Sequence, residues 1–125
     1  MKIFYDSLTG MGRSFAEKLG YESHSVHELN PYDLDEKIFL ITRSINFGQV
    51  PDNTLDFLDD LKDFGKLNLL VGTAVTGNKN WGENYGKAGE TIEKDYGIPL
   101  ILKFEARGFK RDIEVIKEFL DKEKD

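Results

Sequence analysis

Hydrophobic residues in this chain gather in short runs, each followed by a more polar segment with turn residues. The runs at residues 2–5, 37–42, 67–75 and 99–104 are rich in residues that favour strands. The run at 37–42 is continuously apolar, as in a strand that is covered on both faces. Residues 22–29 are more polar and alternate weakly, so we expect them to form a strand at the edge of the sheet.

The segments between these runs repeat hydrophobic residues every three or four positions, which predicts amphipathic helices. Asp52 or Asn53 is expected to cap the second helix, and Gly20, Gly65 and Gly97 are expected to end the first three. The predicted core-facing residues are Phe15, Ala16 and Leu19, then Leu55, Leu58 and Leu61, then Tyr85, Ala88, Ile92 and Tyr96, and finally Ile113, Ile116, Phe119 and Leu120.

Strands and helices alternate along the whole sequence, which predicts an α/β fold with a doubly wound parallel sheet. We expect about five strands between two layers of helices, and one domain over residues 1–125, because no linker or repeat interrupts the pattern. Only about ten residues separate the second and third strands. That is too short for a regular crossover helix, so this connection should be abbreviated.

The composition excludes several classes of function. The chain has no cysteine, which removes disulfides, thiolate metal sites and cysteine nucleophiles. Its formal charge of -6 argues against nucleic-acid binding and is compatible with a basic protein partner. No apolar run is long enough for a membrane span and no signal-peptide pattern is present, so we expect a cytoplasmic protein without membrane association. His24 and His27 would lie on opposite faces of a strand, so no shared metal site is expected.

Three polar loops, at residues 7–13, 43–51 and 76–84, follow the first, third and fourth predicted strands. In a 2-1-3-4-5 strand order these strands are neighbours, and ligands of such sheets bind outside the carboxyl ends of the strands. The first loop carries the hydroxyls of Ser7 and Thr9 and leads into a helix, whose N-terminus suits a phosphate. It matches neither the nucleoside-triphosphate loop nor the GxGxxG dinucleotide pattern. The loop is therefore suited to one terminal phosphate, such as that of FMN.

Trp81 is the candidate for stacking on a flat ring, because its polar, glycine-rich loop has little else to cover an aromatic side chain. The alternative is that it packs on the protein surface. Phe47 could form a second wall or rim, or it could cover the neighbouring helix. Other classes of protein with this topology fit less well. A receiver domain needs an aspartate where Thr42 and Arg43 stand, and a phosphatase of this topology needs a cysteine, which the chain lacks. A serine hydrolase needs a histidine in the crevice, and neither His24 nor His27 is placed to reach it.

Several segments resemble the NrdI family: YDSLTG at 5–10, LIT at 40–42, FGQVP at 47–51, TGNKNWG at 76–82, and PL with KFE within 99–105. The GNxN-aromatic-G loop is the most specific of them. NrdI proteins are small flavodoxin-like FMN proteins that serve class Ib ribonucleotide reductases. The resemblance implies that reduced FMN forms superoxide from oxygen, which oxidises the dimanganese centre of the reductase small subunit during assembly of its tyrosyl radical. An unidentified electron donor would reduce the FMN.

The resemblance also implies which residues bind FMN, with no catalytic side chain among them. The expected contacts are Ser7, Leu8, Thr9, Gly10, Met11 and Gly12 at the phosphate, and Thr42, Arg43, Ser44, Ile45, Asn46, Phe47 and Gly48 together with Thr76, Gly77, Asn78, Asn80, Trp81 and Gly82 at the ring. The sequence departs from the family at Met11, where asparagine is usual, and at Asn46, where glycine is usual. These departures bear on FMN affinity and on the reduction potential.

Two other functions fit the same scaffold. One is a general electron-transfer flavodoxin for another enzyme, and the other is a flavin-free binding module. Electron carriers crowd acids around the ring, whereas Arg43 and Lys79 are expected near it here, with Glu83 the nearest obvious acid. The colour of the purified protein separates a flavoprotein from a flavin-free module.

Overall fold

The computed structural model describes residues 1–124 and contains a five-stranded sheet in which all neighbouring strands are parallel. The strand order is β2-β1-β3-β4-β5, which confirms the prediction. The strands are β1 (Lys2–Tyr5), β2 (Glu22–Ser25), β3 (Ile38–Arg43), β4 (Leu70–Gly77) and β5 (Leu100–Glu105).

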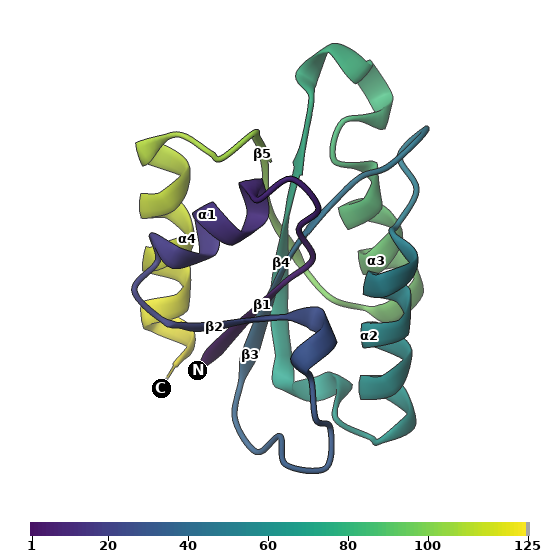
Figure 1. Cartoon of the computed structure of the whole chain (residues 1–125), viewed down its shortest axis with the longest axis vertical. Coiled ribbons are helices and arrows are strands. Elements are labelled where there is room, and N and C mark those ends of the chain that lie inside the picture. Colours follow the sequence, from purple (N-terminus) through teal and green to yellow (C-terminus); the bar gives the residue numbers. More distant parts are fainter. Residues whose placement is uncertain (125) are drawn as a thin grey trace.

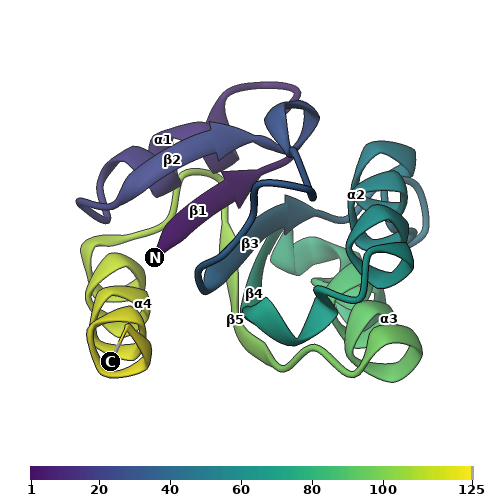
Figure 2. The same ribbon diagram turned by 90° about the horizontal axis from the view of Figure 1, so that it is seen from below.

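Helices cover both faces of the sheet, so that the chain forms three layers (Figures 1 and 2). α1 and α4 pack on one face, and α2 and α3 pack on the other. The α-helices are α1 (Met11–Glu17), α2 (Asp52–Asp63), α3 (Lys87–Tyr96) and α4 (Lys110–Glu123), and short 3-10 helices form η1 (Val26–Glu28), η2 (Leu67–Leu69) and η3 (Lys79–Asn84). No helix within residues 1–124 has both the length and the apolar composition needed to cross a membrane.

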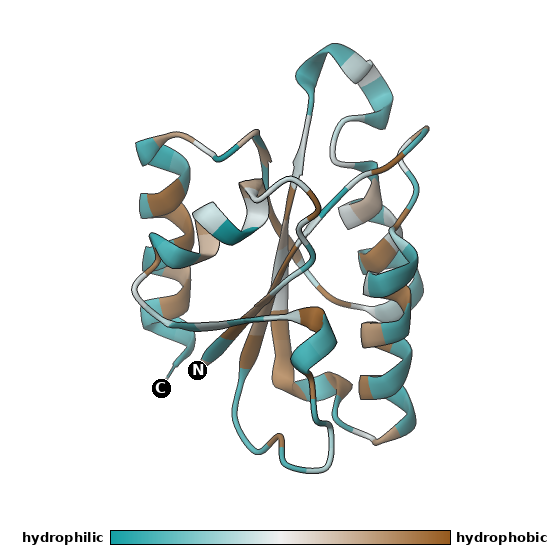
Figure 3. Ribbon diagram, in the orientation of Figure 1, coloured by the Kyte–Doolittle hydropathy of each residue, from teal (hydrophilic) through white to brown (hydrophobic). Residues whose placement is uncertain are grey.

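The core consists of two hydrophobic clusters, one on each side of the sheet. Alternate residues of β3 belong to different clusters: Ile38 and Leu40 face α2 and α3, whereas Phe39 and Ile41 face α1 and α4. This alternation follows from the two-residue period of a strand. Figure 3 shows the hydrophobic colour concentrated in the central strands and on parts of the helices. The prediction of a strand buried on both faces is confirmed for residues 38–42, whereas Lys37 lies outside β3.

β3 and β5 are each shifted by one residue from the predicted bounds, and β2 and β4 differ by more because local turns compete with the sheet. β2 stops at Ser25 rather than continuing to residue 29, since Ser25 Oγ accepts the backbone N–H of His27 at 3.3 Å and caps η1. Residues 67–69 form η2 instead of the start of β4. β4 extends through Thr76 to Gly77, so the loop that follows it begins later than expected.

Two helices also begin at other residues than predicted. Pro51 is the N-cap of α2, and no side chain of the described residues caps this helix, so the expected cap at Asp52 or Asn53 is wrong. Asp52 instead lies in the first turn, where its carboxylate favours the helix dipole. α3 begins at Lys87, which leaves Tyr85 in the preceding loop. The connection between β2 and β3 contains only η1, as the short spacing predicted.

Candidate functional site

A cavity of about 390 Å³ lies at the carboxyl ends of the strands, where the loops after β1, β3, β4 and β5 meet. This is the edge at which ligands of doubly wound sheets bind, and the volume is within the usual range for small-molecule sites. The cavity is lined by Thr9, Met11, Arg43, Ser44, Thr76, Gly77, Asn78, Trp81, Glu105 and Ala106. The structure therefore brings together the three loops that the sequence singled out and adds a fourth.

The turn between β1 and α1 has unpaired donors. Gly10 is the N-cap of α1 with φ 86°, a left-handed conformation that glycine adopts without strain, and no side chain within residues 1–124 caps the helix. The first turn of α1 contains no acidic residue. Ser7 Oγ is buried and has no hydrogen-bond partner among the described residues. Thr9 and Met11 line the cavity, whereas Leu8 is exposed and Gly12 is buried.

Arg43, the last residue of β3, supplies the positive charge of the cavity wall. Its Nε lies 3.7 Å from Oδ1 of Asp6, a buried carboxylate at the end of β1. Nε is itself buried and makes no hydrogen bond to the described part of the chain. The guanidinium is thus held beside Asp6 at the cavity with donor capacity to spare.

Thr42 takes part in a buried hydrogen-bond network beneath the cavity instead of lining it. Thr54 Oγ1 donates to Asp6 Oδ2 at 2.6 Å. Thr42 Oγ1 lies 2.7 Å from the same hydroxyl, and since the proton of Thr54 is used for Asp6, Thr42 is the donor of this second bond. The network connects the ends of β1 and β3 to α2.

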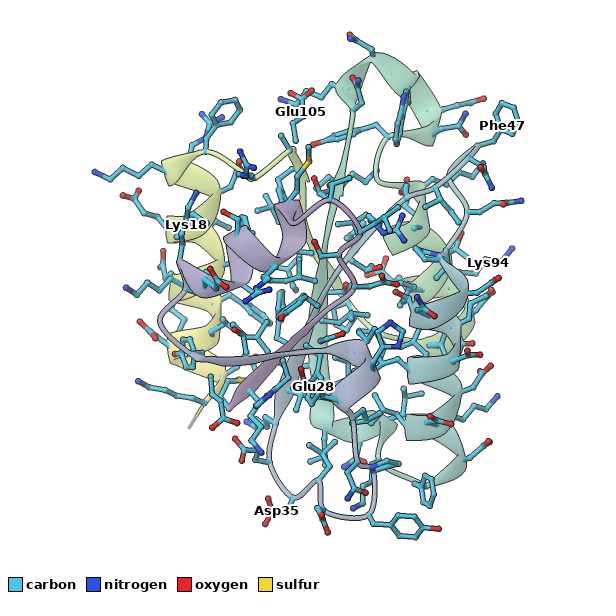
Figure 4. All side chains as sticks on the ribbon, in the orientation of Figure 1. Lys18, Glu28, Asp35, Phe47, Lys94 and Glu105 are labelled. Atoms are coloured by element: carbon cyan, nitrogen blue, oxygen red, sulfur yellow. The ribbon has the colours of Figure 1, made fainter. Side chains whose placement is uncertain are left out.

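Residues 45–49 form a tight hairpin beside the cavity. Ile45 N donates to Gln49 O at 3.0 Å, and Gln49 N donates to Ile45 O at 2.8 Å. Asn46 has φ 51°, a left-handed conformation that asparagine tolerates better than most residues, and Gly48 is also left-handed. Phe47 is 83% exposed at the tip, and Figure 4 shows it pointing away from the molecule. Within this loop Ser44 lines the cavity, whereas residues 45–48 do not.

Asparagine side chains and glycines shape the loop after β4. Asn78 Oδ1 accepts the N–H of Asn80 at 2.8 Å, and the carbonyl of Asn78 accepts the N–H of Trp81 at 3.0 Å. Trp81 lines the cavity and is 42% exposed, while Asn80 and Gly82 lie outside the lining. A Cβ on Gly77 would lie 3.6 Å from the Trp81 ring, at ordinary contact distance, so the ring lies close to the end of β4.

Two lining residues, Glu105 and Ala106, were not predicted. They come from the end of β5 and the loop that follows it. Ala106 accepts a hydrogen bond from Thr76 in β4, and Glu105 accepts one from Lys79 in the loop after β4. Position in the sheet was the signal that could have identified them: β5 is the neighbour of β4 in the predicted order, so its carboxyl end must reach the same edge.

His24 and His27 lie outside the cavity lining. The His24 ring lies 2.6 Å from Glu22 Oε2 and 2.9 Å from Glu28 Oε2, and the hydrogen bond to Glu22 is the main reason why the pKa of His24 is raised. His27 is exposed in η1. Within residues 1–124 no three His, Cys, Asp or Glu side chains form a group suited to a metal ion.

The sheet order and the position of the cavity define a protein with the flavodoxin fold. A short-chain flavodoxin associated with a bacterial microcompartment superposes with a TM-score of 0.73 at 19% identity, covering 96% of this chain and 93% of that one. A flavodoxin of Streptococcus pneumonia TIGR4 gives 0.72 at 20% identity, covering 96% and 94%. A Fusobacterium nucleatum flavodoxin solved with bound flavin mononucleotide gives 0.62 at 18% identity, covering 81% and 66%.

The chain belongs to the NrdI flavodoxin-like family, whose model matches residues 3–118. The Protein NrdI of Bacillus licheniformis is 34% identical over 122 residues, which cover 98% of this chain and 88% of the relative. The Protein NrdI of Macrococcus caseolyticus is 38% identical over 119 residues, which cover 95% and 85%. The family resemblance seen in the sequence motifs is confirmed.

Proposed function

We propose that this chain is a cytoplasmic FMN-binding redox protein that supplies superoxide, formed from reduced FMN and oxygen, for assembly of the dimanganese-tyrosyl radical cofactor of a class Ib ribonucleotide reductase. The observation that carries the flavin part is the convergence of the predicted loops on one cavity with unpaired donors beside it. Membership of the NrdI family supports the reductase small subunit as partner.

The turn between β1 and α1 fits the phosphate of FMN. A dianionic phosphate would provide acceptors for the buried hydroxyl of Ser7 and for the N–H groups of the first helical turn, which no side chain within residues 1–124 caps. Thr9 would add a second hydroxyl at the cavity wall. Gly10 adds no side chain to this turn, so backbone groups can approach the ligand, whereas Gly12 is buried in α1 close to Ile41 of β3.

The rest of the cavity fits a flat, partly polar ring. Trp81 would stack against it, while Asn78 and the backbone on either side of Gly77 would provide hydrogen-bonding groups at its edge. Arg43 would place a positive charge where the reduced ring carries a negative one. When bound, FMN supplies the electron-transfer chemistry. The protein residues bind and orient it, shield one face from water and adjust its potential.

An FMN titration of the flavin-free protein tests the first half of this proposal. Trp81 is the only tryptophan, so quenching of its fluorescence would show that FMN binds close to it, and absence of quenching at saturation would contradict stacking. Replacing both Ser7 and Thr9 by alanine should weaken FMN binding by about 1.5–3 kcal/mol for each hydrogen bond lost to the charged phosphate. Riboflavin, which lacks the phosphate, is the matched ligand control. If riboflavin bound the unaltered protein as tightly as FMN, the phosphate assignment would be wrong.

A radical-assembly assay tests the second half. The reduced protein and oxygen are added to a manganese-loaded class Ib small subunit, and the tyrosyl radical is quantified by electron paramagnetic resonance. We expect radical only when this protein is present and reduced. A general flavodoxin, reduced to the same extent, serves as the control: an equal radical yield from it would favour electron transfer without a dedicated partner and contradict the proposal.

A further inference from the structure

Glu105 lies where two loops of the cavity leave the sheet. It is the last residue of β5 and pairs in register with Gly77, the last residue of β4. Beyond this pair the chain from β4 enters the loop that carries Trp81, and the chain from β5 turns towards α4. Figure 4 shows Glu105 at this end of the molecule. Its side chain is 34% exposed and lines the cavity.

Hydrogen bonds on both sides of Gly77 join the end of β4 and the loop after it to the end of β5 and the loop after that strand. Glu105 Oε2 accepts the backbone N–H of Lys79 at 3.2 Å, and Thr76 Oγ1 donates to the carbonyl of Ala106 at 2.8 Å. Lys79 is the first residue of η3, where the N–H group has no partner within the helix. Glu105 therefore accepts the otherwise unpaired N–H at the start of η3, and Trp81 lies two residues further along the chain.

Glu105 also contributes negative charge to the cavity wall. Among the residues that line the cavity it is the only carboxylate, and Arg43 is the only cation. The Lys79 ammonium lies 3.9 Å from Glu105 Oε1, but the Lys79 side chain is 62% exposed and lies outside the lining. Solvent screens a charge in that position, so Lys79 offsets only part of the carboxylate charge.

We propose that Glu105 is a positioning residue of the flavin site: it holds the Trp81 loop through the Lys79 N–H, and its charge lowers the reduction potential of the bound flavin. This inference rests on the proposed function. The two roles are separable, because the hydrogen bond needs only an acceptor oxygen, whereas the effect on the potential needs the negative charge.

Two substitutions separate the roles. Glu105→Gln keeps an acceptor oxygen and removes the charge, so FMN affinity should stay within about threefold while the two-electron potential rises. Glu105→Ala removes both, so affinity should fall about tenfold and the amide hydrogen of Lys79 should exchange faster even without flavin. Glu90→Gln is the matched control, because Glu90 forms an ion pair of 2.7 Å with Lys103 of β5 outside the cavity lining.

Thermal unfolding of each variant, measured without flavin, shows whether the fold is retained. An unchanged potential in Glu105→Gln would overturn the electrostatic role. An unchanged FMN affinity and Lys79 exchange rate in Glu105→Ala would overturn the positioning role. If the unaltered protein did not bind FMN, the proposed function would fail and this inference with it. Normal FMN binding together with unchanged Lys79 exchange in every variant would refute only the positioning role.

Discussion

Thr54 of α2 is the centre of the buried network beneath the cavity, and replacing it by valine tests how much that network stabilises the fold. Valine has nearly the same shape but neither donates nor accepts a hydrogen bond. Thr54→Val would remove the 2.6 Å bond to the Asp6 carboxylate and the 2.7 Å bond from Thr42. All three side chains are buried, so water has little access to replace the lost partners.

The magnitude follows from the two bonds. A hydrogen bond to a carboxylate contributes about 1.5–3 kcal/mol and one between neutral hydroxyls about 0.5–1.5 kcal/mol. The extra buried methyl group of valine offsets about 0.8 kcal/mol. We therefore expect the free energy of unfolding to fall by about 2–3 kcal/mol. For a chain of this size that corresponds to a Tm lower by about 10 °C.

Urea unfolding followed by far-UV circular dichroism measures this difference. Thr54→Ser keeps the hydroxyl and loses only a methyl group, so it should cost about 1 kcal/mol and leave both hydrogen bonds in place. Thr91→Val, at a half-buried position of α3, controls for the change from threonine to valine in a helix. If Thr54→Val were no less stable than Thr54→Ser, the network would not have the stabilising role deduced from its geometry.

Three further substitutions have defined outcomes. Arg43→Glu should lower the reduction potential of bound FMN by some tens of millivolts if the charge lies about 7 Å from the ring; spectroelectrochemistry measures this, and an unchanged potential would contradict it. The hydrogen bond to Glu22 raises the pKa of His24, so protonated His24 stabilises the fold fully below about pH 6.5, and this stabilisation is lost as the pH rises through the raised pKa. The difference in unfolding free energy between the unaltered protein and His24→Gln should therefore shrink at high pH. Gly89→Ala should lower Tm despite the better helix propensity of alanine, because its Cβ would lie 2.5 Å from Leu100 Cδ1; overpacking of this kind costs about 1–3 kcal/mol.

The sequence predicted the sheet order and the place of the cavity because both depend on the alternation of elements. The apolar run in β3 and the polar loops after β1, β3 and β4 were sufficient to locate the ligand-binding edge. Helix and strand ends were less predictable, since they depend on single local hydrogen bonds. The bond from His27 N to Ser25 Oγ, which ends β2, is one of these.

Which individual side chains reach the site depends on the register between neighbouring strands, and the hydrophobic pattern of the sequence does not encode that register. β4 and β5 change register between Thr73 and Ala74, and this shift determines that Glu105 lies beside Gly77. Glu105 stands in the KFE segment that resembles the family, but that segment does not show which of its side chains reaches the cavity. Phe47 was a candidate ring contact because it is aromatic, but the left-handed backbone at Asn46 and Gly48 carries its side chain outward.

Because Trp81 lies in the loop after β4, its fluorescence distinguishes local opening of that loop from unfolding of the whole chain. Its indole reports on the loop after β4, whereas far-UV circular dichroism reports on the sheet and helices of the whole chain. Loops of this kind often open with a smaller free energy than global unfolding requires. In a denaturant titration, a tryptophan transition that precedes the dichroism transition would measure the local stability of the loop. A ligand that stacks on Trp81 would draw the two transitions together.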